Sequence, residues 1–193
     1  MIIFKSLPNT QPTHLTETDL INECIKKNNL CQRLLFEKYA GKMMSLCQRY
    51  AKDQQETKDI MQEGFIRVFD YIHQFKNEGS FEGWMRRVFV SVATRYISKR
   101  KISFNDIDIV DTDTVTVDPS VVSKLSVDEI HKYISRMPEG YRLVFNLNVV
   151  EGYSHEEIGL LLGIQASTSR TQLTKARRML QSFILKTFNT VLL

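Results

Sequence analysis

Long apolar runs are missing from this chain of 193 residues. No segment approaches the roughly 20 consecutive apolar residues that a membrane-spanning helix needs. The apolar run near the N-terminus, Ile2–Phe4, is too short for a secretion signal. Together these absences predict a protein of the cytosol.

Cysteine is rare as well, with three residues in the whole chain. Cys24 and Cys31 lie seven positions apart and can share a helix face, while Cys47 stands alone. A metal site would need closer ligands and nearby histidines, which the sequence does not supply. We interpret all three as buried, reduced thiols, in keeping with the cytosol.

Residue patterns typical of catalysis are also missing. We find no metal-ligand cluster, phosphate-binding glycine loop or nucleophile constellation, so we expect no enzymatic activity, no cofactor and no small-molecule substrate. His155 precedes Glu156 and Glu157, but the second histidine of a zinc helix motif is missing. These residues fit the polar first turn of a helix better, because acids there face the positive end of the helix dipole.

Acidic residues are absent from two segments, 83–101 and 158–193, although the formal net charge of the chain is only +4. Between these segments lies an acidic stretch. Two basic segments around an acidic one predict two surfaces that face polyanions. The basic residues are Arg86, Arg87, Arg95, Lys99, Arg100 and Lys101 in the first segment, and Arg170, Lys175, Arg177, Arg178 and Lys186 in the second.

Apolar periodicity predicts an all-α protein made of two small helical domains joined by a flexible acidic linker. We expect a loose tail over residues 1–15, a first domain over 16–101, the linker over 102–123 and a second domain over 124–188. The second domain breaks at Met137-Pro138, Gly152 and Gly163, which divides it into four helices.

The linker assignment depends on composition. Aspartate, threonine, valine and serine dominate residues 102–123, and Asp118 before Pro119 disfavours a helix. The alternation over residues 113–117 is typical of a strand, but the sequence offers no evident partner strand. We therefore interpret the segment as a connection between the domains.

Four helices are expected in the first domain. Thr18 or Asp19 caps a helix that runs through Leu35 and continues over residues 36–50. A helix over 56–75 follows, and Ser80 caps the last one. The core-facing rows of these last two helices are Met61, Phe65, Val68 and Ile72, then Phe81, Trp84, Val88, Val92 and Tyr96.

The second domain contains a helix-turn-helix pattern. Ser154 and Glu157 have the spacing of a capping box, Gly159 allows close approach of a second helix, and Gly163 permits a left-handed turn. Ser167 can cap the second helix, which such a motif inserts into a DNA major groove. The polar face of that helix offers Arg170, Thr171, Gln172, Thr174 and Lys175.

An ordinary helical hairpin with a solvated basic face explains the same pattern. Ser169 favours this alternative, because an apolar residue usually packs at its position in the second helix of the motif. The acid-free, basic C-terminal segment favours the DNA-binding interpretation.

Several stretches, taken in order, resemble one family. They are ETKDIMQEGFIRVFDYI from residue 56, FKNEGSFEGWMRRV from 75, MPEGYRLVF from 137, EGYSHEEI from 151 and TSRTQLTKARR from 168. This ordered set, within residues 18–185, resembles the extracytoplasmic-function (ECF) sigma factors of the sigma-70 family. The chain departs from the family pattern at Gly64, Ser169 and Gln172.

The resemblance implies a partner for the helix over 56–72, namely bacterial core RNA polymerase. Asp59, Gln62, Glu63 and Ile66 lie off the apolar row of that helix and are the expected polymerase contacts. Without the resemblance, a solvated helix face would be the preferred interpretation. An anti-sigma protein that inhibits the factor is a further expected partner.

The resemblance also implies two contacts with promoter DNA. In the first domain, Asn77 and Ser80 of the loop over 76–80 would meet a base of the −10 element, while Arg87, Arg95 and Lys99 would hold phosphates along one helix face. In the second domain, the expected contacts with the −35 element are Ser167, Arg170, Thr171, Gln172 and Lys175, with Arg170 suited to guanine and Gln172 to adenine.

The remaining alternative is a stand-alone transcription regulator. That function needs only the C-terminal motif and would leave the first domain for dimerisation or sensing. Binding to polymerase separates the two functions.

Overall fold

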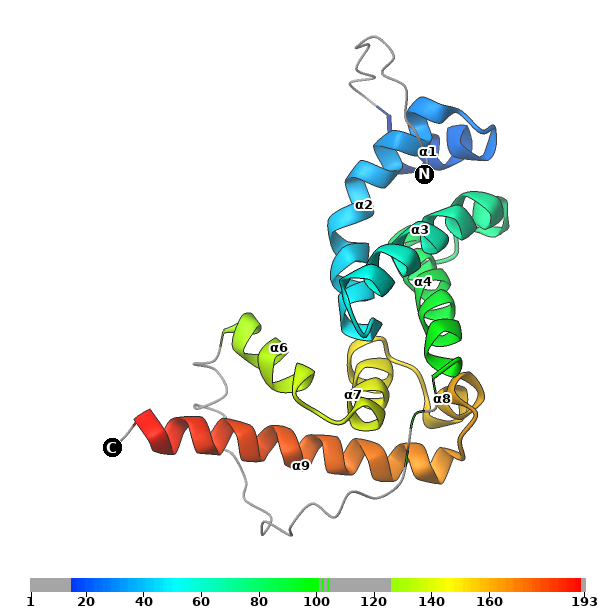
Figure 1. The fold of residues 1–193 in the computed structure, drawn as a ribbon. Helices are drawn as coiled ribbons and strands as arrows, with labels where there is room; N and C mark the ends of the chain where they lie inside the picture. Colours follow the sequence, from blue (N-terminus) through cyan, green and yellow to red (C-terminus); the bar gives the residue numbers. More distant parts are fainter. Residues whose placement is uncertain (1–14, 101, 103, 105–125, 192–193) are drawn as a thin grey trace.

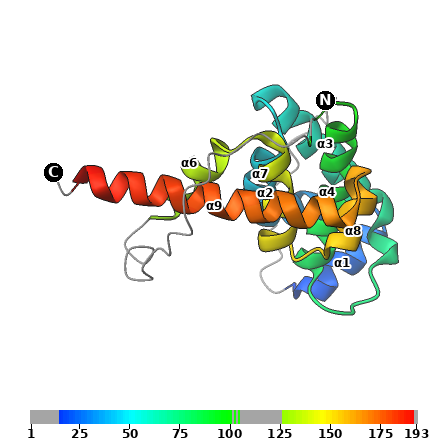
Figure 2. The ribbon, with the colours of Figure 1, turned by 90° about the horizontal axis from the view of Figure 1, so that it is seen from below.

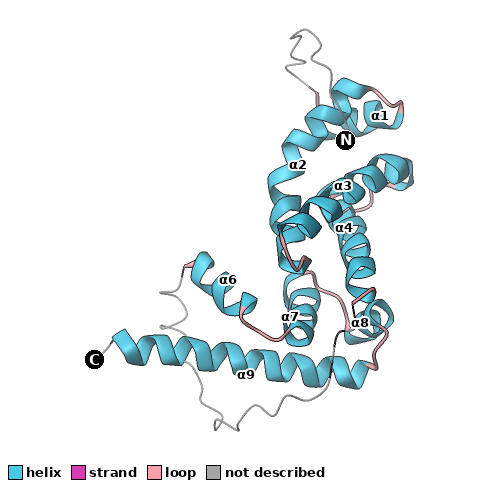
Figure 3. Ribbon diagram, in the orientation of Figure 1, coloured by secondary structure: helices cyan, strands magenta, loops and turns pink. Residues whose placement is uncertain are grey.

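The computed structural model describes residues 15–100, 102, 104 and 126–191. Over these residues the chain is helical, without strands, and the helices are joined by short loops (Figure 3). The expectation of an all-α fold is confirmed. Nearly all of the expected tail (1–15) and linker (102–123), including the alternating segment 113–117, lies outside the described residues.

The first half of the molecule consists of helices packed around one apolar core (Figure 1). An aromatic cluster lies within it, where the Phe65 ring is 4.6 Å from that of Phe36 and 5.2 Å from that of Phe89. The elements are α1 (Glu17–Ile25), α2 (Asn29–Tyr50), α3 (Gln54–Tyr71), a 3₁₀ turn (Ile72–Gln74) and α4 (Phe81–Ser98).

The break between the first two helices lies earlier than expected. Thr16, not Thr18 or Asp19, is the N-cap of α1, and its capping box closes onto the carboxylate of Asp19. The chain then turns at Lys27, whose φ is 62°. Asn28 begins α2 by accepting two backbone N–H groups. The helix through Leu35 with its continuation over 36–50 is therefore wrong, because a capping asparagine starts a new helix at residue 29.

Helices α3 and α4 approach each other at a glycine. A Cβ atom at Gly64 would lie 2.3 Å from Cε1 of Phe89, a distance that real side chains do not reach. The apolar row of α3 is buried as predicted, and Phe65 and Val68 of that row lie next to this contact point. The departure from the family pattern at Gly64 thus has a packing reason.

The core-facing row of α4 differs from the expected one. Trp84, Val88 and Tyr96 are only partly buried at the edge of the core, although Phe81 and Val92 are fully buried. The expected row was rotated by about one residue, or 100°, because α4 is apolar on two adjacent faces. The side chains that fill the core are Phe81, Met85, Phe89, Ala93 and Ile97.

The second half lies against one long helix (Figures 1 and 2). The breaks predicted at Met137-Pro138, Gly152 and Gly163 are confirmed. At the far end of the long helix, the Tyr133 ring stacks on Phe183 at 6.0 Å and its hydroxyl donates to Thr187 Oγ1. The elements are α6 (Val127–Ser135), α7 (Glu139–Phe145), a π-helical turn (Asn146–Val150), α8 (His155–Leu162) and α9 (Ala166–Val191).

The two halves are in contact. Helix α4 packs against α8, and the end of α2 faces α7 and the π-helical turn (Figure 1). Buried apolar residues of both halves belong to one continuous cluster. None of the helices in the described part of the chain is long and apolar enough to cross a membrane.

Candidate nucleic-acid interface

Helices α8 and α9 form the expected helix-turn-helix. The backbone N–H of Ser154 donates to Glu157 Oε2 at 2.8 Å, and the Glu157 N–H donates back to Ser154 Oγ at 3.2 Å. Gly163 ends α8 with φ 68°, a left-handed conformation that glycine adopts without strain. A Cβ atom at Gly159 would lie 2.8 Å from the Ile164 carbonyl oxygen, so a glycine is needed where the turn passes α8.

A polar pair joins the two helices of this motif. Ser169 is fully buried, and its hydroxyl oxygen lies 2.9 Å from Nδ1 of His155. The serine therefore occupies the usual apolar position because it has a histidine partner. Sequence reasoning counted Ser169 against the motif and left His155 as a polar first-turn residue, since neither signal alone reveals the pair.

The exposed face at the start of α9 carries Arg170 and Thr171, as expected. Arg170 Nη1 lies 3.2 Å from Glu156 Oε1, in an exposed and therefore weak ion pair. Lys175 lies further along and is partly buried. Ser167 was expected to cap the helix, and that expectation is wrong, because α9 already begins at Ala166 and Ser167 lies within its first turn.

Gln172 is not on the solvated face where it was expected. Only 1% of this residue is exposed, and its Nε2 donates a hydrogen bond of 3.0 Å to the carbonyl oxygen of Phe104. Phe104 therefore covers Gln172 at this point of α9. In the arrangement described here the Gln172 amide does not face solvent.

The predicted phosphate row of α4 is exposed over its whole length. Arg87, Ser91, Arg95 and Lys99 all face solvent. Ser80 caps α4 as predicted, accepting the Gly83 N–H at 3.0 Å.

The loop before α4 is fully exposed over residues 76–80. Within it Asn77 has φ 57° and Gly79 has φ 79°. These left-handed residues make a tight turn, which presents the Asn77 and Ser80 side chains beside the start of α4.

A groove of about 400 Å³ lies between the end of α3 and α4. Trp84 and Tyr71 supply aromatic faces, and Arg67 and Arg87 supply positive charge. Proteins that bind single-stranded nucleic acids combine aromatic side chains, on which the bases stack, with nearby positive charge. Sequence reasoning placed Trp84 in the core and did not consider Arg67 or Tyr71, although their i, i+4 spacing on α3 would have placed them together.

The predicted polymerase face of α3 is only partly exposed. Gln62 and Ile66 are exposed, whereas Asp59 is half-buried. The Glu63 carboxylate accepts from Arg67 Nε at 3.2 Å and pairs with Arg95 of the phosphate row. The acidic face of α3 and the basic row of α4 therefore meet edge to edge.

Electrostatics at this seam agree with the contacts. Burial raises the pKa of Tyr96, and the charge of Glu63 and a hydrogen bond to it raise that pKa further. Glu63 was expected to be freely exposed, but 29% of its side chain is accessible, because Arg67 and Arg95 cover it.

Family models match both halves of the chain. The model for sigma-70 region 2 matches residues 35–102, and that for sigma-70 region 4 matches residues 127–180, together more than half of the chain. This chain belongs to the sigma-70 family. The resemblance to ECF sigma factors that the motifs indicated is confirmed, and the protein is an RNA polymerase sigma factor. A stand-alone regulator is not favoured, because region 2 accompanies region 4.

Curated relatives carry the corresponding names. This sigma factor is 25% identical over 186 residues to the ECF RNA polymerase sigma-E factor of Haemophilus influenzae, covering 88% of this chain and 96% of that protein. It is 27% identical over 156 residues to the RNA polymerase sigma-H factor of Pseudomonas aeruginosa, covering 75% and 81%.

Solved structures that match this chain are less similar in sequence than these relatives. CnrH in complex with the cytosolic domain of CnrY matches with a TM-score of 0.47 and 15% identity, covering 86% of this chain and 94% of that one. RpoE in complex with the anti-sigma factor NepR from Bartonella quintana matches with a TM-score of 0.48 and 17% identity, covering 80% and 96%.

Proposed function

We propose that this sigma factor binds core RNA polymerase through α3 and directs it to promoters whose −10 and −35 elements its two halves read separately. Residues 16–101 would act as the first domain and 124–188 as the second, in the cytoplasm and without enzymatic activity. The observation that carries the proposal is the adjacency, on α3 and α4, of an acidic and apolar face, a basic row and an aromatic groove.

The division of labour on the DNA follows from exposure. In the first half, the loop with Asn77 and Ser80 stands beside the groove that contains Trp84 and Tyr71, which together suit a base removed from the duplex. The exposed cations of α4, namely Arg87, Arg95 and Lys99, suit the flanking phosphates.

In the second half, Arg170 and Thr171 stand on the exposed first turns of α9, the part of a recognition helix that reaches base edges. Ser167 and Lys175 lie on either side of them. Gln172 joins this set only when its hydrogen bond to the Phe104 carbonyl oxygen is broken.

The proposed polymerase contact has a direct test. Ile66 and Ile25 are both isoleucines with 40% of their surface exposed, on α3 and α1 respectively. We expect Ile66→Ala to weaken binding to core polymerase by at least about fivefold, as a contact residue does, and Ile25→Ala to leave it unchanged. Affinity is measured by anisotropy of the labelled sigma factor titrated with core enzyme.

The same samples test initiation on a defined promoter with core polymerase. Equal affinity of the Ile66→Ala and Ile25→Ala variants would contradict the assignment of the α3 face. Failure of the wild-type protein to support initiation would contradict the function itself.

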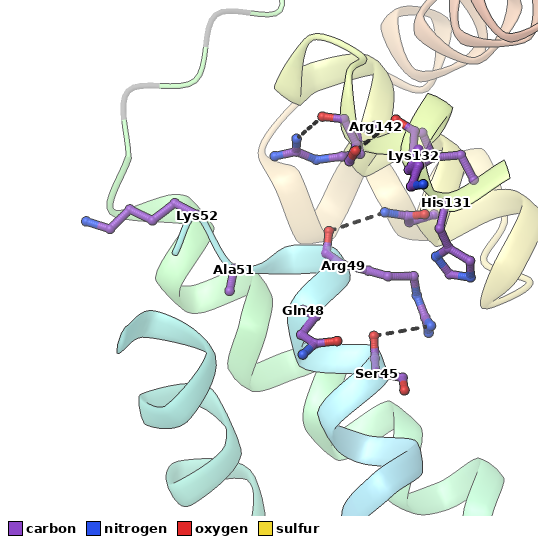
Figure 4. A pocket seen from close by; sticks show the side chains of 11 residues that line it. Ser45, Gln48, Arg49, Ala51, Lys52, His131, Lys132 and Arg142 are labelled. Atoms are coloured by element: carbon purple, nitrogen blue, oxygen red, sulfur yellow. Dashed lines mark hydrogen bonds between the residues drawn. The ribbon is translucent and has the colours of Figure 1, made fainter. Parts of the chain in front are cut away.

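An anti-sigma protein is the proposed inhibitor. A cleft of about 780 Å³ separates the end of α2 from α6 and α7, so one segment placed there touches both halves (Figure 4). Lys52, His131 and Lys132 line it, and none of the described residues that line it is acidic. The inhibitory segment is therefore expected to be acidic. The measurement is co-purification of an inhibitor with the sigma factor from cells that express the factor natively. We expect the inhibitor to be lost when Lys52→Glu and Lys132→Glu are introduced together.

A further inference from the structure

Two successive residues at the start of α8 contact two successive residues of α9. His155 Nδ1 lies 2.9 Å from the hydroxyl oxygen of Ser169, and Glu156 Oε1 accepts from Arg170 Nη1 at 3.2 Å. Both contacts join residues that are 14 positions apart, so they follow the same register. The first turn of α8 therefore lies beside the residue of α9 that the proposed function assigns to a base.

The first of these contacts is buried and fixes the place of the second. Ser169 has an exposed fraction of 0%, and a buried hydroxyl is costly without a hydrogen-bond partner. His155 supplies that partner, so the two helices are held together at this point. Because Glu156 follows His155 and Arg170 follows Ser169, the carboxylate and the guanidinium are kept within reach of each other.

The carboxylate of Glu156 is itself held in place. Its pKa is lowered from the ordinary 4.5, first because its own backbone N–H donates to it and then because Arg170 does. The group is therefore negatively charged at neutral pH. An acid that is bonded to the helix backbone on one side and to an arginine on the other can set the direction of the arginine side chain.

The stability of the fold does not account for this pair. The Glu156 and Arg170 side chains are 67% and 57% accessible, and ion pairs as exposed as this one contribute little to folding. The acid also stands beside a cation expected to meet DNA, where a negative charge repels phosphates and lowers affinity for any sequence. A residue that lowers general affinity is expected where discrimination between sequences is gained.

An arginine that turns freely has two kinds of partner on DNA. Its guanidinium can bind any phosphate or can bind O6 and N7 of guanine, and only the second contact carries sequence information. With Nη1 bonded to Glu156, the Nε–Nη2 edge of Arg170 presents two donors that match the two guanine acceptors. A side chain held in this way also has less rotamer freedom to lose when it docks.

We propose that Glu156 is a positioning residue for recognition of the −35 element, which directs the Arg170 guanidinium toward guanine and away from neighbouring phosphates. This role rests on the proposed function, in which Arg170 reads a base edge. Promoter preference then depends on a residue of α8 that touches no base itself.

The test compares Glu156→Gln with Glu157→Gln in the full chain bound to core polymerase. Each substitution removes one negative charge from the same helical turn. Glu156 contacts Arg170, whereas Glu157 accepts the Ser154 N–H, which a glutamine at that position also does. Duplexes with a randomised −35 element are captured by each holoenzyme at two salt concentrations and then sequenced.

Glu156→Gln should lower the preference for guanine at one position by roughly fivefold, the lower end of what one bidentate base contact contributes. It should also raise the affinity for mixed-sequence duplexes and steepen the salt dependence of log K by about 0.9, because the released Arg170 gains a phosphate contact. Glu157→Gln should keep the guanine preference. Damage to the fold would instead lower the affinity for every sequence. Equal guanine preference in the wild type and in Glu156→Gln would overturn the positioning role.

Arg170→Ala distinguishes this role from the proposed function. It should abolish the guanine preference, and adding Glu156→Gln to it should then change the preference at no position, since both act through one guanidinium. Guanine preference that survives Arg170→Ala would contradict the reading role of Arg170 itself. A change of preference when Glu156→Gln is added to Arg170→Ala would overturn the positioning role alone.

Discussion

The two halves of this sigma factor fill their interiors differently. In the first half, the described side chains buried to 1% exposure or less are apolar except for the hydroxyl of Tyr50. In the second half, Asn146, Ser169 and Gln172 are buried to the same degree, each with a polar partner. The packing of the first half is therefore determined by the volumes of its buried side chains. The packing of the second half depends partly on hydrogen bonds between buried polar groups and their partners.

This difference bears on what each half can tolerate. A core set by volume resists any change of size, because protein interiors are close-packed. Hydrogen-bonded pairs depend on their partners, and two of the three buried polar groups of the second half find theirs in the first half or the segment after α4. The second half is thus the one whose environment changes when the halves separate.

The largest expected effect tests the volume argument in the first half. Gly64→Ala places a methyl group against the Phe89 ring, and we expect the overpacking to cost about 1–3 kcal/mol of unfolding free energy. Gly41→Ala is the control, because nothing lies within 4 Å of a Cβ there. That change should stabilise α2 by up to about 1 kcal/mol. Urea unfolding of both variants measures the difference, and equal stabilities would contradict close packing at Gly64.

A smaller effect is expected from the polar pair of the second half. Ser169→Ala leaves Nδ1 of His155 without its partner and should cost about 1 kcal/mol. Trp84 is the single tryptophan of the chain and lies in the first half. Its fluorescence should hence report the first half alone, while circular dichroism reports all helices. We expect the substitution to shift the dichroism transition and not the fluorescence transition; the opposite result would break the comparison.

The smallest effect concerns the capping boxes under acid. Hydrogen bonds from Ser154 lower the pKa of Glu157 below its ordinary 4.5, and hydrogen bonds from Thr16 lower that of Asp19 below 3.8. Each carboxylate with a lowered pKa stabilises the folded state when the pH is above the ordinary pKa of that group. This stability is lost as the pH falls through the folded-state pKa.

Helix α8 should lose its first turn before α1 does as the pH falls. The ordinary pKa of its capping acid is higher, and α8 buries only Ile158, whereas α1 buries Leu20, Ile21 and Cys24. Backbone chemical shifts of both helices across an acid titration measure the order. If α1 frayed at a higher pH than α8, the number of buried residues in a helix would not determine how strongly its first turn depends on its capping acid.

Local chemistry explains what the sequence could predict. The caps at Ser80 and Ser154 and the turn at Gly163 depend on residues within one helical turn, so their signals are complete in the sequence. The exposed row of α4 and the apolar row of α3 follow from helical periodicity in the same way.

Several of the errors arose where distant residues or two equal signals decide. Helix α4 is apolar on adjacent faces, and the sequence does not say which face meets the core. Gln172 is covered by Phe104, 68 positions away. Ser169 is buried because His155 lies across the turn, and Glu63 is covered by Arg95 of another helix. None of these contacts has a local pattern.

The length of α9 allows a movement at one end of the helix to displace the other end. This single helix of 26 residues spans about 39 Å at 1.5 Å per residue. Its second turn carries Arg170, and its far part contacts Tyr133 of α6 through Phe183 and Thr187. Because an unbroken helix is stiff, a small tilt of α9 at Phe183 and Thr187 produces a larger displacement of its N-terminal end, which carries Arg170. A protein that binds α6 and shifts it slightly would therefore reorient Arg170, which lies roughly 20 Å along α9 from the α6 contact. It would do so without touching the DNA-reading surface.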